Sequence, residues 1–67
     1  MPRKIRDLLK ELRKAGFVID RQKGSHRQFK HPAFTGVITL SGAEGDDAKP
    51  YQERQVAEVV AKSNPRN

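Results

Sequence analysis

The chain contains no cysteine, so neither a disulfide framework nor a thiolate metal site can stabilise it. Apolar residues are 34% of its 67 residues, and a chain of this length buries only about 60% of its extended surface, so we expect a small core whose stability a partner increases. No apolar run approaches the roughly 18 residues of a membrane span, and no signal-peptide segment follows the amino terminus. We therefore expect a soluble, cytoplasmic domain over residues 1–63 with a flexible tail at 64–67.

Acidic residues are scarce in the first half of the chain. Residues 1–31 hold ten Lys and Arg against three Asp and Glu, a net charge of +7, whereas residues 32–67 hold four against five, a net charge of −1. The two values sum to the overall charge of +6. A basic half is typical of proteins that bind a polyanion. A solvated surface that keeps a small protein in solution explains the composition about as well, so charge alone leaves both interpretations open.

Residues 2–15 carry the clearest periodic pattern. Their apolar residues recur at the three- and four-residue spacing of an amphipathic helix, and basic residues fill the other faces. Pro2 suits a first helical turn, and Gly16 can adopt the left-handed conformation that ends a helix. The apolar stripe comprises Ile5, Leu8, Leu9, Leu12 and Ala15, and the basic positions are Arg3, Lys4, Arg6, Lys10, Arg13 and Lys14.

A strand is predicted over residues 17–22, which are rich in β-branched and aromatic side chains. Phe17 and Ile19 are expected on its inner face. Lys23 and Gly24 follow as a tight turn, because glycine supplies the positive φ that hairpin turns favour.

The second strand is predicted over residues 26–31. Phe29 is its only large apolar side chain and should face the core, so the two-residue period of a strand places Arg27 and His31 on the same face. The opposite, open face then carries His26, Gln28 and Lys30.

The rest of the chain predicts a turn at 32–36, a third strand at 37–40, a loop at 41–49 and a helix from Pro50 to about Lys62. The loop contains two glycines and an acidic patch, so we expect it to be mobile. The fold class is therefore α+β with the order α-β-β-β-α. A three-stranded antiparallel sheet would carry two helices on one face and leave the other open, as in double-stranded-RNA-binding domains.

The sequence lacks metal-ligand spacings, a Gly-rich phosphate loop and a nucleophile-histidine-carboxylate set, so we expect no metal and no cofactor. One reaction needs only what the chain offers. RNA carries its own nucleophile, the 2′-hydroxyl, and its cleavage requires a base, an acid and cations around the phosphate. His26 beside Lys23, Arg27 and Lys30 supplies these groups. The same residues would equally hold a phosphate backbone without chemistry, and a lone histidine in a basic stretch is usually only a surface residue.

His31 calls for a different interpretation. It precedes Pro32, which biases it toward extended geometry, and it shares a face with Phe29. A structural, turn-anchoring role is favoured over catalysis.

These residues carry a family resemblance. The pattern Gly24-Ser25-His26-x-x-Phe29-x-His31-Pro32, placed after an amphipathic helix and a Gly16-Phe17 strand start, resembles the HicA family of bacterial toxins. These are small mRNA-degrading ribonucleases of type II toxin–antitoxin systems with a double-stranded-RNA-binding-like fold. The likeness covers the first 40 residues and extends in topology to the second helix.

The resemblance implies a catalytic role for His26, with Gly24 as the turn glycine that presents it and Ser25 as the small residue before it. It also implies a cognate HicB-type antitoxin that binds the toxin and covers this histidine. Arg27 and Lys30 are basic positions of the motif, and we assign them to RNA contact from their charge.

Two functional hypotheses follow. The first is a metal-independent endoribonuclease, an mRNA interferase, in which His26 exchanges protons and neighbouring cations hold RNA. The alternative is a non-catalytic module that binds double-stranded RNA along the basic face of the first helix. A weaker third possibility is an interaction subunit for an acidic protein. The secondary RNA-binding candidates on that helix are Arg6, Lys10, Arg13 and Lys14.

Overall fold

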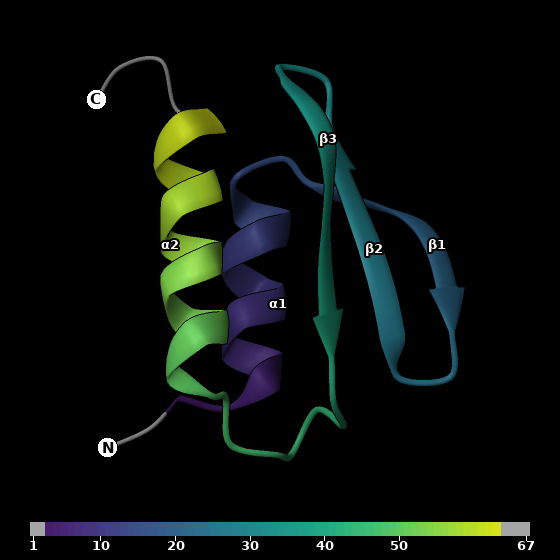
Figure 1. The fold of residues 1–67 in the computed structure, drawn as a ribbon, viewed down its shortest axis with the longest axis vertical. Coiled ribbons are helices and arrows are strands. Elements are labelled where there is room, and N and C mark those ends of the chain that lie inside the picture. The colour runs from purple at the N-terminus through teal and green to yellow at the C-terminus, as the bar shows by residue number, and fades with distance from the viewer. Residues whose placement is uncertain (1–2, 64–67) are drawn as a thin grey trace.

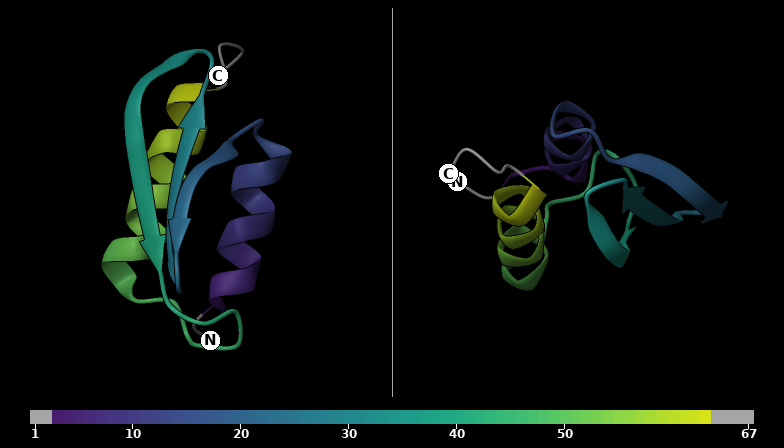
Figure 2. Two further views of the ribbon diagram at one scale, coloured as in Figure 1. Left: turned by 90° about the vertical axis from the view of Figure 1, so that its right-hand side faces the viewer. Right: turned by 90° about the horizontal axis from the view of Figure 1, so that it is seen from above.

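The computed structural model describes residues 3–63, except the side chains of residues 34 and 35. It consists of α1 (Ile5–Lys14), β1 (Val18–Lys23), β2 (His26–His31), β3 (Phe34–Ser41) and α2 (Pro50–Ser63). The three strands form one antiparallel sheet in the order β1-β2-β3. Both helices lie side by side on one face of the sheet (Figures 1 and 2). The predicted α-β-β-β-α order is therefore confirmed.

The first helix buries the apolar stripe that its sequence predicts. Ile5, Leu8, Leu9 and Leu12 are all buried. The helix begins at Ile5 rather than at residue 2, and the expected role of Pro2 lies outside the described residues. The backbone N–H of Lys4 donates to the Asp7 carboxylate at 3.0 Å, which fixes this start.

The helix ends as expected at Gly16, which has a φ of +96°. Gly16 N–H donates to the Arg13 carbonyl at 3.0 Å, and Phe17 N–H donates to the Leu12 carbonyl at 2.9 Å. This pair of hydrogen bonds is the Schellman arrangement, and it turns the chain directly into β1.

The core lies between the helices and the inner face of the sheet. Phe29 on the central strand is fully buried, as predicted, and Ile38 and Leu40 of β3 lie beside it on the same face. The side chains that complete the core come from both helices and the segments next to them: Ile5, Leu8, Leu9, Leu12, Phe17, Ala48, Val56 and Val59.

His31 joins the end of α1 to the β2–β3 turn. Its Nδ1 accepts the backbone N–H of Ala33 at 3.0 Å, so its Nε2 carries the proton and donates to the Ala15 carbonyl at 2.9 Å. The imidazole also packs on the ring of Phe17, with centroids 4.8 Å apart. The prediction that His31 anchors the turn is confirmed. The turn itself is shorter than expected, because β3 already begins at Phe34.

β1 differs from its prediction in one respect. Ile19 was expected to be buried with Phe17, yet it is 40% exposed. It does pair with Phe29 on the inner face, but β1 is an edge strand and all six of its residues are exposed. Seen from above in Figure 2, β1 projects beyond the helices, so no helix covers this part of the inner face. The register of β1 also shifts at Asp20, between Ile19 and Arg21.

The loop between β3 and α2 is bonded to α1, contrary to the expectation of a mobile segment. The first two N–H groups of α1, from Ile5 and Arg6, donate to the carbonyls of Asp46 and Glu44 at 2.9 and 3.2 Å. The loop thereby satisfies donors that a helix start otherwise leaves unpaired. Ala48 of this loop is buried in the core.

The second helix confirms its predicted start at Pro50 and ends one residue later than expected, at Ser63. Buried Gln52 joins it to the sheet, because its side chain accepts the Lys49 N–H and donates to the Ser41 carbonyl, both at 2.9 Å. The tail predicted at 64–67 lies outside the described residues. Within residues 3–63, neither helix has the length and apolar character to cross a membrane.

Candidate functional site

His26 is the first residue of the central strand, and its side chain is exposed. Buried and exposed residues alternate along β2: Arg27 and Phe29 are buried, while His26 and Lys30 are exposed. The predicted outward orientation of His26 is therefore confirmed. Its pairing partners are Lys23 on β1 and Ser41 on β3.

A two-residue turn places Lys23 opposite His26. Gly24 has a φ of +59°, as the first central position of a type II′ hairpin turn requires, and Ser25 completes the turn. The Gln22 side-chain amide donates to the Gly24 carbonyl at 3.1 Å. Paired residues of an antiparallel sheet have Cβ atoms about 4.5–5.5 Å apart on the same face, so the imidazole and the ammonium share one surface.

Lys30 lies on the same open face but not beside His26. Lys30 is four positions further along the strand, which corresponds to about 13 Å. The Lys30 ammonium forms an ion pair with Asp20 at 3.3 Å. The structure therefore brings together Lys23 and His26, and leaves Lys30 at the far end of β2.

Arg27 occupies a different place from the other predicted cations. Arg27 lies on the inner face of the sheet and is only 8% exposed. Its Nη1 donates to the carbonyls of Ser25 and Gly42, at 3.3 and 3.0 Å. The guanidinium is thus bonded to one carbonyl of the β1–β2 turn and to one carbonyl of the segment after β3.

Arg21 is a cation of this surface that the sequence did not indicate. A strict two-residue period from Phe17 and Ile19 would place Arg21 on the inner face. The register shift at Asp20 instead pairs Arg21 with Gln28, on the open face between His26 and Lys30. A bulge of this kind adds one residue to a strand and inverts the alternation beyond it, and no local sequence signal at Asp20 marks it.

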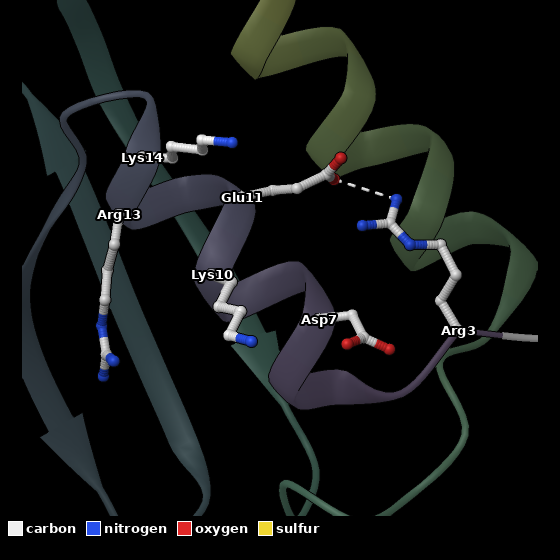
Figure 3. Close-up of a pocket in the computed structure, with 6 residues that line it drawn as sticks. All are labelled: Arg3, Asp7, Lys10, Glu11, Arg13 and Lys14. Carbon is white, nitrogen blue, oxygen red and sulfur yellow. Dashed lines mark ion pairs between the residues drawn. The ribbon is translucent and has the colours of Figure 1, made fainter.

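A second basic surface lies on the outer side of α1. Figure 3 shows a shallow hollow there, in which Arg3 and Glu11 lie beside α2 while Arg13 lies on the side of α1 away from α2. Arg3 pairs with Glu11 at 3.0 Å, and this hydrogen bond raises the pKa of Arg3 above its ordinary value. The residues that line the hollow are Arg3, Asp7, Lys10, Glu11, Arg13 and Lys14.

The predicted cations of α1 are all exposed, but they do not meet His26. Both helices cover the inner face of the sheet (Figure 2). His26 lies on the opposite, open face. The side chains concerned are Arg6, Lys10, Arg13 and Lys14. Among the described residues, no three His, Asp or Glu side chains gather as a metal site would require.

The fold and this surface together define a class of protein: a small α-β-β-β-α domain with a basic amino-terminal half and an exposed histidine beside a hairpin turn. Residues 5–61 match the family described as the HicA toxin of bacterial toxin–antitoxin. The chain therefore belongs to the HicA toxin family, and the resemblance noted in its sequence is confirmed. Neither the curated proteins nor the solved structures compared with the chain gave a match.

Proposed function

We propose that this HicA-family toxin is an endoribonuclease that cleaves mRNA without a metal or other cofactor, with His26 as its catalytic residue. The observation that carries the proposal is the placement of His26. It is exposed on the open face of the sheet, it follows a tight turn, and it stands opposite Lys23. An imidazole and an ammonium on one accessible surface are the groups that phosphodiester cleavage by the 2′-hydroxyl needs.

In the proposed reaction, neutral His26 accepts the proton of the 2′-hydroxyl as the 2′-oxygen attacks phosphorus. The bond between phosphorus and the 5′-oxygen then breaks, and the imidazolium returns the proton to the departing 5′-oxygen. The products are a 2′,3′-cyclic phosphate and a 5′-hydroxyl, and no net proton is gained or lost. A histidine suits both transfers because its unperturbed titration lies near neutral pH.

Lys23 stabilises the negative charge that develops on the phosphate oxygens. His31 takes no part, because both of its ring nitrogens are bonded to the backbone. Arg21 and Lys30 extend the cationic surface along the strands, where they hold the phosphates that flank the cleaved bond.

The cognate partner in this proposal is a HicB-type antitoxin that covers the open face. Val18 and Val37 are each 52% exposed, and β1 has no neighbouring strand on its outer edge. Such a protein would bury these apolar side chains and block access to His26.

A non-catalytic module for double-stranded RNA is the second candidate. The observation that favours it is the basic hollow on α1, which lies away from His26 and offers cations without an adjacent histidine. Tight binding of duplex RNA with no cleavage product would support this candidate.

The first experiment compares purified parent protein with His26→Ala and Gln28→Ala. Gln28 is the matched control, because it lies two residues along the same strand on the same face. We expect His26→Ala to lower the cleavage rate by on the order of 10²–10⁴-fold, the contribution of a general acid–base group. We expect Gln28→Ala to cleave RNA at close to the parent rate.

The thermal midpoint and the RNA affinity of His26→Ala should match those of the parent, because an exposed side chain contributes little to the core. Cleavage by His26→Ala at the parent rate would overturn the assignment of His26. Cleavage by neither parent nor variant, with tight binding by both, would favour the binding module.

A further inference from the structure

Arg27 is a buried cation with no acidic partner among the residues that the structure describes. Among residues 3–63, none of the ion pairs involves its guanidinium, although Arg3, Lys4, Lys30 and Lys62 all pair with carboxylates. Placing a charged group in a core costs free energy unless hydrogen bonds compensate it. Within residues 3–63, the hydrogen bonds that compensate it go to two backbone carbonyls.

The two carbonyls belong to segments far apart in the chain. Ser25 is the last residue of the β1–β2 turn, directly before His26, and Gly42 is the first residue after β3. Gly42 N–H also donates to the Ser25 carbonyl at 3.3 Å. Arg27 therefore closes a junction between the turn and the β3–α2 loop, which meet at the same end of the sheet (Figure 1).

The first residue of α1, Ile5, packs against this junction. Gly42 has a φ of +121°, and a Cβ at this position would lie 3.3 Å from a side-chain carbon of Ile5. Ile5 is itself buried, and its N–H is bonded to the carbonyl of Asp46 in the same loop. Ile5 at the start of α1 therefore packs against Gly42, and Arg27 joins Gly42 to Ser25, the residue that precedes His26.

From this geometry we infer that Arg27 is a positioning residue: it fixes the turn that presents His26 and Lys23 to RNA, and it does not contact RNA itself. The inference rests on the proposed function of His26. The charge of Arg27 had suggested an RNA contact, but both hydrogen bonds of its Nη1 go to backbone carbonyls of the protein itself. We therefore assign Arg27 a positioning role in place of that contact. Lysine should reproduce the role only in part, since its compact ammonium on a flexible stem is less pre-organised than the planar guanidinium.

The test uses the parent, Arg27→Met and Arg27→Lys, with Lys62→Ala as the control for loss of a surface cation, because Lys62 pairs with Glu58 on α2 and its loss should change neither the rate nor the affinity. The cleavage rate at saturating RNA and the RNA dissociation constant are measured separately, below the thermal midpoint of each variant. We expect the saturating rate of Arg27→Met to fall on the order of a hundredfold, because small displacements of a catalytic group have effects of this size. Its dissociation constant should stay within about twofold of the parent value, and Arg27→Lys should recover part of the rate.

A rise in the dissociation constant with an unchanged saturating rate would show that Arg27 contacts RNA, and would overturn the inference. An unchanged saturating rate with unchanged affinity would also overturn it. The inference would also be overturned if the loss of cleavage rate in Arg27→Met were fully explained by the fraction of unfolded protein and if Arg27→Lys recovered none of the rate.

Amide hydrogen exchange tests the junction without reference to cleavage. We expect the Gly42 amide to exchange on the order of tenfold faster in Arg27→Lys than in the parent, while the Phe17 amide at the end of α1 is unchanged. If His26→Ala retains full activity, the proposed function is wrong, whatever the exchange rate of the Gly42 amide. If His26 proves catalytic but Gly42 exchange and the saturating rate do not respond to Arg27, only the positioning role fails.

Discussion

The two histidines of this chain differ in what surrounds their ring nitrogens. Both nitrogens of His31 are bonded to backbone groups, and its ring packs on Phe17. His26 lies five residues earlier on the same strand, with its side chain exposed. Residue type is therefore no guide to role here. The alternation of the strand turns one imidazole toward the end of α1 and leaves the other exposed on the open face.

The ring of His31 packs closely against Gly16. A Cβ on Gly16 would lie 3.0 Å from Nε2 of His31, and the φ of +96° disfavours any side chain. We expect Gly16→Ala to lower the free energy of unfolding by about 1–3 kcal/mol, measured by urea denaturation. Gly45→Ala is the control, because no atom lies within 4 Å of its added Cβ, and it should change stability by less than about 0.5 kcal/mol. Equal losses in the two variants would contradict this account.

At the level of elements, the sheet is covered unevenly. β3 and β2 lie against the helices, whereas β1 projects past them with every residue exposed (Figure 2). Two isoleucines on the inner face of the sheet illustrate the difference: Ile38 is 2% exposed and Ile19 is 40% exposed. The edge position of β1 leaves its outer edge without a neighbouring strand, while β2 and β3 pack against the helices.

This uneven cover predicts different costs for the same substitution. Ile38→Ala should lower the free energy of unfolding by about 2–5 kcal/mol, because it leaves a cavity in the core. Ile19→Ala should lower it by about 1 kcal/mol or less, because much of the side chain is already in water. Chemical denaturation of both variants measures the difference, and a loss from Ile19→Ala as large as that from Ile38→Ala would mean that β1 is covered after all.

At the scale of the whole molecule, positive charge is present on two separate surfaces. One is the open face of the sheet around His26, with Lys23 and Arg21 nearby on β1. The other is the outer side of α1, including Arg13. A strand of RNA bound at His26 reaches the second surface only by passing around an edge of the sheet, so the two surfaces can be tested independently.

Salt dependence distinguishes a cation that contacts RNA from one that does not. Using His26→Ala to prevent cleavage, we expect Arg13→Gln to reduce the slope of log affinity against log salt by about 0.7–0.9 if α1 binds a phosphate in the complex. Lys62→Gln is the control, because Lys62 pairs with Glu58 on α2 and should leave the slope unchanged. Identical slopes for parent and Arg13→Gln would exclude α1 from the RNA interface.

Local sequence pattern determined most of the architecture. The stripe from Ile5 to Leu12 predicted α1, Gly16 predicted its end, and the alternation about Phe29 predicted that His26 faces outward. These predictions succeeded because helix period, glycine conformation and strand parity are local properties of the backbone.

Tertiary structure decided what depends on segments distant in sequence. The exposure of Ile19 arises because the helices do not cover β1, and the orientation of Arg21 follows from a register shift against β2. The burial of Arg27 depends on Gly42, fifteen residues away, which supplies one of the carbonyls that its guanidinium needs. Charge and spacing alone suggested RNA contact for Arg27, because a sequence shows which donors a side chain carries but not which acceptors the fold brings to it.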